Sequence, residues 1–221
     1  MSNRKSFEKT HQMVVTAMLC AVSFIAVLLG RFIPAVQGFL SYDPKDAIIV
    51  IAGFIYGPMT SVVISVVVSI IEMFFGSSTG IYGCIMNIVS TCSFTVPAAL
   101  MYKKLHSMKG AGLGLLLGTL CVTAMMCLWN YIITPFYMGM PRATVAAMLP
   151  TVFLPFNLIK GGINAGLTLV LYKPLVTALR KADLVPQHQG SQGHFHVGFT
   201  LISVLVLITF VLLFLVFTGV L

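Results

Sequence analysis

Long apolar runs, separated by short polar turns, take up most of this chain. A helix that crosses a membrane needs about 20 mostly apolar residues, because lipid offers backbone groups no hydrogen-bond partners. Hydrophobic residues make up 58% of the 221 residues and charged residues only 8%, whereas soluble domains carry about 25% charged residues. The sequence therefore predicts an all-α integral membrane protein.

The apolar runs and their breakers predict the helices. Gly-Pro at 57–58 separates two of them, since proline cannot continue a helix interior. We expect helices over 13–33, 45–57, 59–75, 81–102, 111–134, 147–179 and 197–221. We assign residues 1–182 to a six-helix membrane domain and 183–196 to a polar linker. The purely apolar segment 197–221 is expected to be an additional, lipid-facing transmembrane helix.

Lysine and arginine residues predict the orientation in a cell membrane. Cytoplasmic loops of membrane proteins carry an excess of these residues. With the N-terminus inside, the inner flanks and loops hold nine of them and the outer loops hold Arg31 and Arg142. The N-terminus is therefore expected to be cytoplasmic. We interpret the net charge of +8 as this topology signal, and we expect no nucleic-acid partner.

The sequence lacks the motifs that would indicate nucleotide binding or several kinds of enzyme. The chain has no GxxxxGK[ST] motif for a nucleoside triphosphate and no HExxH or GxSxG motif. Glu72 is the only acid deep in an apolar segment, and His194 and His196 fall in the polar linker. We expect neither an enzyme nor a metal site. A stand-alone secondary carrier, proton-coupled through Glu72, remains an alternative.

The segment "LPFNLIKGGIN" at 154–164 places polar groups at membrane depth. Asn157, Lys160 and Asn164 share one helix face, and Thr168 continues it. An ammonium in lipid costs about 3 kcal/mol or more, so this row is expected to face a cavity. Asn130 stands in another polar row. Ser/Thr rows elsewhere, including Thr123, are expected to join packed helices.

The loop before the second segment, residues 34–44, is predicted to be extracellular. Its Phe39 and Tyr42 offer aromatic surface. Asp43 and Asp46 offer acceptors, although capping of the following helix is the simpler interpretation. This loop and the polar rows of the helices would together form an outward-facing, partly apolar cavity. Such a cavity suits an aromatic, largely uncharged ligand with several donors and acceptors.

The stretch "FLSYDPKDAIIVIAGFIYGP" at 39–58 resembles the substrate-binding S components of energy-coupling factor (ECF) transporters. "WNY" at 129–131 and "FNLIKG" at 156–161 are similar to the riboflavin-specific members. The resemblance covers residues 10–182. It implies a subunit that captures riboflavin outside the cell for ATP-driven uptake by partners, namely a transmembrane coupling subunit and two ATPase subunits. Riboflavin would be the transported ligand and not a cofactor.

The resemblance also implies roles for single residues. Amide and lysine side chains would hold the flavin ring, and the first outer loop would close over it. The substrate-binding residues are expected to be Leu40, Ser41, Tyr42, Asn87, Asn130, Asn157, Lys160 and Asn164. Ala17 and Ala21 match a small-xxx-small motif that contacts the coupling subunit, with packing inside this chain as the alternative.

The choice of ligand within this family stays open between riboflavin and another small vitamin such as thiamin or pantothenate. A cationic thiamin ring would favour nearby acids. The site is expected to be cationic at Lys160, which favours riboflavin.

Overall fold

The computed structural model describes residues 2–36, 38–75, 80–182, 184 and 197–220. In the described residues the chain is almost entirely helical and forms no strand, with only an isolated antiparallel bridge between Val36 and Leu40. The elements are α1 (Ser2–Gly30), α2 (Lys45–Tyr56), α3 (Pro58–Phe74), α4 (Gly80–Leu105), α5 (Met108–Met138), α6 (Arg142–Met148), a π-helical turn η1 (Leu149–Phe153), α7 (Leu154–Lys181) and α8 (Val197–Thr218). The predicted all-α class is confirmed. The predicted linker, apart from Leu184, lies outside the described residues.

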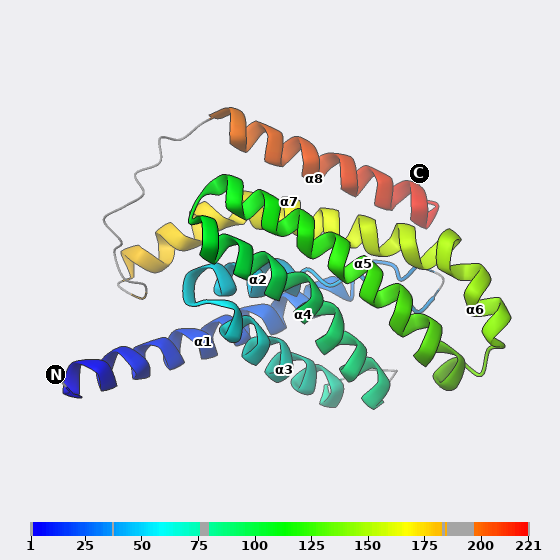
Figure 1. Cartoon of the computed structure of the whole chain (residues 1–221), viewed down its shortest axis with the longest axis horizontal. Coiled ribbons are helices and arrows are strands. Elements are labelled where there is room, and N and C mark those ends of the chain that lie inside the picture. The colour runs from blue at the N-terminus through cyan, green and yellow to red at the C-terminus, as the bar shows by residue number, and fades with distance from the viewer. Residues whose placement is uncertain (1, 37, 76–79, 183, 185–196, 221) are drawn as a thin grey trace.

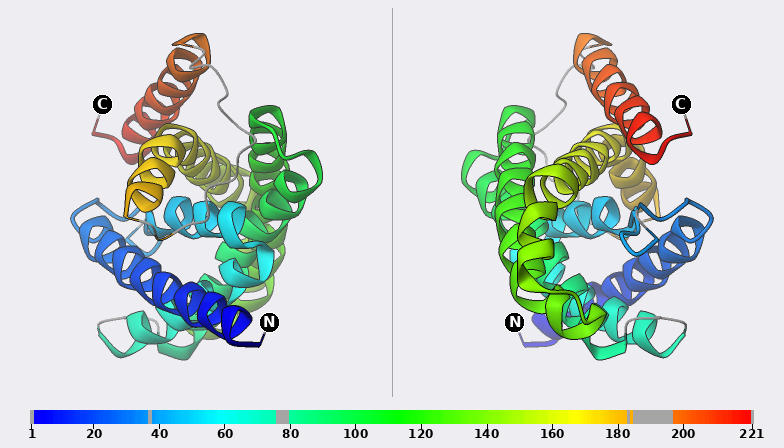
Figure 2. Two further views of the ribbon diagram at one scale, coloured as in Figure 1. Left: turned by 90° about the vertical axis from the view of Figure 1, so that its left-hand side faces the viewer. Right: turned by 90° about the vertical axis from the view of Figure 1, so that its right-hand side faces the viewer.

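The short helix α2 lies in the middle of the bundle and packs against α1, α3, α4 and α7 (Figure 1). Most of α2 is buried. The bundle continues from α4 to α5, from α5 to α7 and from α7 to α8. As a result α8 lies on the far side of the bundle from α1 (Figure 2).

Five helical stretches of the described chain are long and apolar enough to cross a membrane: Thr10–Gly30, Gly80–Leu105, Met108–Met138, Arg142–Lys181 and Thr200–Thr218. The helices α2, with 12 residues, and α3, with 17 residues, fall short of the usual length of about 20. These lengths do not confirm the predicted count of six helices plus one.

Several predicted boundaries were wrong. The break expected at residues 134–142 is shorter, because α5 continues through Pro135 to Met138. It ends where Gly139 adopts a left-handed backbone with φ 64°, a conformation that glycine tolerates. The single segment expected at 147–179 is instead α6, a π-helical turn and α7. α1 ends at Gly30, and 31–33 belong to the loop.

Glycines bring α4 and α5 into close contact. A β-carbon at Gly114 would lie 2.7 Å from the carbonyl oxygen of Ala98, and one at Gly118 would overlap the carbonyl oxygen of Phe94. Small residues allow such backbone approach between membrane helices. This contact fixes α5, which carries Asn130, against α4.

The same glycines generate a prediction about stability. Gly118→Ala should lower the midpoint of thermal unfolding of the detergent-purified protein, because overpacking costs about 1–3 kcal/mol. The matched control is Gly112→Ala, since nothing lies within 4 Å of a β-carbon there. The control should leave the midpoint unchanged or raise it, because alanine favours helix. Equal midpoints for both variants would contradict the close-approach interpretation.

Candidate ligand-binding site

A cavity of about 480 Å³ lies between the loop that follows α1 and the helices α1, α3, α4, α5 and α7. This volume lies within the usual range of about 300–1,000 Å³ for small-molecule sites. The structure brings seven of the eight predicted site residues to its wall: Leu40, Ser41, Tyr42, Asn87, Asn130, Asn157 and Lys160. Apolar and aromatic side chains, including Phe39, Phe156 and Tyr137, supply much of the remaining wall, which also contains the charged residues Arg31, Asp43 and Glu72.

The eighth predicted residue, Asn164, does not line the cavity and instead ties the loop to α7. The Tyr42 hydroxyl donates to Asn164 Oδ1 over 2.8 Å, and Asn164 Nδ2 donates to the backbone carbonyl of Asp43 over 3.3 Å. Asn164 is 1% exposed. Its position therefore holds Tyr42 and Asp43 beside the cavity.

Lys160 enters the cavity paired with an acid of the loop. Its Nζ lies 3.1 Å from Asp43 Oδ2 and 4.0 Å from Asp46 Oδ2. Burial works to raise the pKa of the Asp43 carboxyl, but the charges of Lys45 and Lys160 outweigh burial and lower that pKa to about 2. Asp43 is therefore ionised at neutral pH.

The simpler interpretation of Asp43 and Asp46 as helix caps was wrong. No side chain caps α2, and Pro44 occupies the N-cap position. Asp46 instead accepts from Thr91 Oγ1 over 2.7 Å and from Asn164 Nδ2 over 3.4 Å. Because Asp46 is 2% exposed, these bonds replace the solvation that its carboxylate loses on burial.

Sequence reasoning missed Lys45. This side chain is fully buried, and its Nζ lies 3.0 Å from Glu72 Oε2 and 3.5 Å from Asp43 Oδ2. Asn87 Nδ2 also donates to Glu72 Oε2 over 3.0 Å, so Glu72 is not the isolated acid that the sequence suggested. The alternating charges of "DPKD" directly before an apolar helix were the available signal.

The two central amides, Asn130 and Asn157, belong to residues that line the cavity and keep unused hydrogen-bonding capacity. Asn130 Nδ2 donates to the carbonyl of Met126, and Asn157 Nδ2 donates to the carbonyl of Phe153, each within its own helix. Thr134 donates to Asn130 Oδ1. An amide has two N–H donors and two acceptor lone pairs, so each retains one donor and acceptor capacity toward a ligand.

Hydroxyl groups join the helices less often than expected. Thr123 and Thr168 donate to carbonyls four residues back in their own helices. Ser61 donates to the carbonyl of Ile49 in α2, and Thr91 donates to Asp46. The expectation of interhelical bonds was therefore wrong for Thr123 and is confirmed for Ser61 and Thr91. Thr168, which was expected to continue the cavity-facing row of α7, does not line the cavity.

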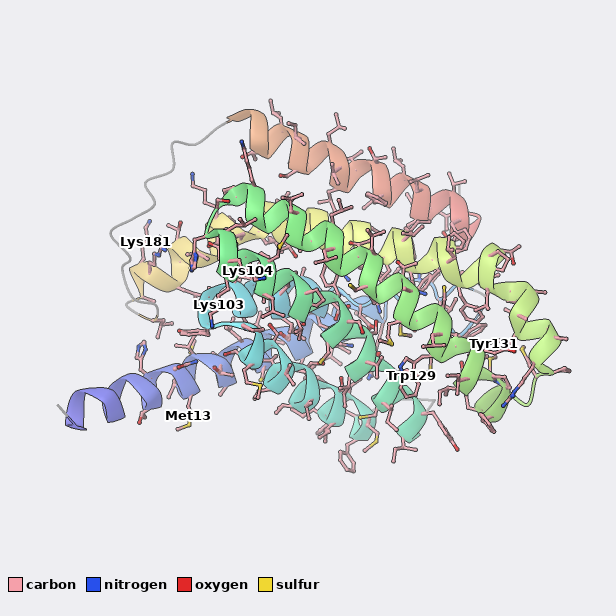
Figure 3. All side chains as sticks on the ribbon, in the orientation of Figure 1. Met13, Lys103, Lys104, Trp129, Tyr131 and Lys181 are labelled. Carbon is pink, nitrogen blue, oxygen red and sulfur yellow. The ribbon has the colours of Figure 1, made fainter. Side chains whose placement is uncertain are left out.

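The labelled side chains of Figure 3 mark the two ends of the bundle. Lys103, Lys104 and Lys181 lie toward the end that holds the N-terminus, and Trp129 and Tyr131 lie toward the opposite end. Asn130, between the latter two in α5, lines the cavity. The cavity is therefore nearer the end that carries the aromatic residues.

The face of α1 that carries Ala17 and Ala21 is exposed. Large apolar side chains surround these alanines, including Met18, which is 47% exposed, and Ile25, which is 55% exposed. The alternative that the two alanines pack inside this chain was therefore wrong. Their contact with a partner stays a prediction.

The fold and its cavity define a multi-pass helical membrane protein with a ligand-sized, polar-lined site. The family model of the substrate-specific component of ECF transporters matches residues 11–172. The chain belongs to this family, which is a class of transporter component and not of enzymes. The helix α8 lies outside the matched residues.

Known proteins of similar sequence and structure agree with this assignment. The riboflavin transporter FmnP of Bacillus subtilis is 31% identical over 188 residues, which cover 80% of this chain and 99% of that protein. The riboflavin transporter RibU of Staphylococcus aureus is 25% identical over 182 residues, 80% of this chain and 96% of that protein. A solved structure of the S component of a bacterial ECF transporter superimposes with a TM-score of 0.67 at 26% identity, covering 78% of this chain and 99% of that one.

The pairing of Asp43 with Lys160 is testable without a ligand. Asp43→Asn and Lys160→Met should each lower the free energy of unfolding, since breaking a buried pair leaves a charge poorly compensated. The double variant should lose less than the sum of the single losses, with a coupling of about 0.5–3 kcal/mol. Denaturant unfolding of the purified, ligand-free protein measures these values.

The control pairs Asp43→Asn with Lys181→Met, a substitution at an exposed position at the end of α7. The effects of these two substitutions should add, because the residues are far apart. Additive losses for Asp43→Asn and Lys160→Met would contradict a direct interaction.

Proposed function

We propose that this S component captures riboflavin in the cavity and presents it to partner subunits for ATP-driven uptake. The observation that carries the proposal is the convergence of Asn130, Asn157 and Lys160 on one cavity. Family membership and the riboflavin transport of the similar proteins support it.

The cavity chemistry suits the isoalloxazine ring of riboflavin. That ring is flat and aromatic, and one edge alternates carbonyl oxygens with nitrogen. The remaining amide donors and acceptors of Asn130 and Asn157 match such an edge. Lys160 carries three N–H donors, and its ion pair with Asp43 leaves donors for a ring carbonyl. Phe39, Tyr137 and Phe156 provide apolar walls for the ring faces.

The electrostatics of the cavity favour a neutral ligand. The expectation of a cationic site was wrong, because the wall includes the acids Asp43 and Glu72 beside the bases Arg31 and Lys160. Each acid is paired with a lysine, Asp43 with Lys160 and Glu72 with Lys45. A cationic thiamin ring would find both acids already compensated. Riboflavin therefore remains the first choice, with thiamin and pantothenate as alternatives.

The loop would close the site. Leu40, Ser41 and Tyr42 line the cavity. Tyr42 donates to Asn164, and Lys160 and Asn164 donate to Asp43, so these bonds hold the loop against α7. Movement of this loop would therefore change access to the cavity. We assign to this segment the retention of bound riboflavin.

The proposed topology has six membrane helices plus α8, with a cytoplasmic N-terminus in the cell membrane. Lys103, Lys104 and Lys181 lie toward the same end as the N-terminus (Figure 3), in agreement with the excess of positive charge inside. The exposed alanines of α1 would contact the transmembrane coupling subunit, which acts with two ATPase subunits. Close helix approach explains the need for small side chains.

Ligand binding tests the site assignment. Lys160→Met should raise the Kd for riboflavin by about 10- to 100-fold, because a hydrogen bond to a charged group contributes about 1.5–3 kcal/mol. Quenching of flavin fluorescence in titrations of purified protein measures the Kd. Lys181→Met should bind as the parent does. Equal affinities of the Lys160→Met variant and the parent would remove Lys160 from the site.

A parallel titration with thiamin and pantothenate distinguishes the ligands. If thiamin or pantothenate bound more tightly than riboflavin, that vitamin would take the place of riboflavin as the proposed substrate.

Uptake tests the role of α1. Ala17→Leu combined with Ala21→Leu should leave the Kd for riboflavin within about twofold of the parent, since both alanines lie on an exposed face away from the cavity lining. ATP-driven uptake should fall at least tenfold, because the added bulk separates closely packed helices. Cells that express the variant with the coupling module and take up radiolabelled riboflavin provide the measurement.

The control for added bulk is Ala124→Leu, at an exposed position of α5. Normal uptake by the double variant would show that this face of α1 is not the coupling surface. Uptake by the chain alone in proteoliposomes would instead support the secondary-carrier alternative.

A further inference from the structure

The helix α8 lies outside the residues that the family model matches, yet it packs against the wall of the site. We propose that α8 positions the ligand-retaining loop, with Phe214 acting through the ring of Tyr42. This inference rests on the proposed function, because the loop that it concerns is the one assigned to retain riboflavin.

The docking of α8 depends on two glycines of α7. At Gly166 a β-carbon would lie 3.0 Å from Cα of Leu207, so the two backbones are in close contact. One turn earlier, Gly162 faces the ring of Phe210, which fills the space that a side chain would need. Figures 1 and 2 show α8 lying along α7 on the outside of the bundle. The contact therefore fixes α8 relative to the helix that carries Lys160.

Phe214 is the residue of α8 that reaches the loop. It is 6% exposed, whereas its neighbour Leu213 is 47% exposed. Its ring centroid lies 6.0 Å from that of Tyr42 at an interplanar angle of 56°. Phe214 also shares an apolar cluster with Val36 and Leu40 of the loop. The outward side of α8 can face lipid, as expected from the sequence, but this side chain contacts the site wall.

Tyr42 is thereby held from two directions. Its hydroxyl donates to Asn164 on α7, and its ring packs against Phe214 on α8. Tyr42 and Leu40 line the cavity. Loss of the Phe214 ring therefore removes one of the two contacts that fix Tyr42, while the polar bonds to α7 and the apolar contacts of the loop with Phe153 and Phe156 remain. We expect this loss to increase loop opening and therefore the dissociation rate of the ligand. The association rate should change little, since changes within one interface act mostly on dissociation.

The position of α8 also distinguishes its role in holding the loop from the proposed contact of α1 with the coupling subunit. It lies on the far side of the bundle from α1 (Figure 2), so it leaves the exposed face with Ala17 and Ala21 open. A defect at Phe214 should consequently appear in ligand retention by the isolated subunit, without any partner present.

The experiment compares full-length Phe214→Ala with Leu213→Ala. Stopped-flow flavin fluorescence measures riboflavin association and dissociation in detergent. Phe214→Ala should raise the dissociation rate about three- to tenfold, as expected for an aromatic pair, and leave the association rate within twofold. Leu213→Ala should match the parent. If the alanine variant does not fold, Phe214→Leu, which keeps most of the apolar volume, should show a smaller increase.

A second set of variants, made in Tyr42→Ala protein, distinguishes positioning of the loop by Phe214 from general destabilisation of the protein. In Tyr42→Ala protein the ring partner is gone, so adding Phe214→Ala should raise the dissociation rate by much less than it does in the parent, because only the apolar contacts with Val36 and Leu40 remain to be lost. Amide hydrogen exchange of residues 38–44 in the ligand-free chain gives a measure that needs no riboflavin. Exchange should be faster in Phe214→Ala and unchanged in Leu213→Ala.

The outcomes separate the two proposals. Unchanged loop exchange and unchanged dissociation in Phe214→Ala, with binding still lost in Lys160→Met, would overturn the role of α8 alone. An undiminished effect of Phe214→Ala in the Tyr42→Ala background would overturn it as well. Faster loop exchange, together with riboflavin binding that neither Lys160→Met nor Phe214→Ala affects, would support the positioning role and refute the proposed site.

Discussion

The buried charges beside the cavity must compensate one another, and the arrangement of the site depends on that constraint. An isolated charge at this depth would lose its hydration without replacement. Lys160 meets Asp43, and Lys45 meets both Glu72 and Asp43. These pairs connect the loop, α2, α3 and α7, which are far apart in the sequence. The charge pairs therefore hold these four elements together beside the cavity.

The charge network and the neutral amides have separate parts in recognition. Paired charges present little net field to a ligand, so specificity is expected to come from geometry and hydrogen bonding. Asn130 and Asn157 are well suited to this, because bonds to their own helices fix their amide orientation. A preorganised amide loses little conformational entropy when a ligand binds. Lys160 adds one cationic donor whose position Asp43 determines.

Parts of this structure follow from local patterns, and others depend on tertiary contacts. The Gly57–Pro58 break and the row of Asn157 and Lys160 were predictable, because helix geometry alone decides them. The pairing of Lys45 with Glu72 was not, since it joins the start of α2 to the end of α3 across space. The continuation of α5 through Pro135 was also missed. Membrane helices tolerate proline where neighbouring groups satisfy the freed carbonyl. The role of α8 escaped prediction because its uniformly apolar composition hides which face packs on protein.

The glycine face of α7 has a consequence for the surroundings of the protein. Side chains at Gly162 and Gly166 are absent, and α8 fills the resulting furrow with Phe210 and Leu207. No acyl chain can lodge there while α8 is in place. The acyl chains of the surrounding phospholipids therefore do not contact this stretch of α7. On this side of the protein, a change in their length or saturation can affect vitamin retention only through the outer surface of α8.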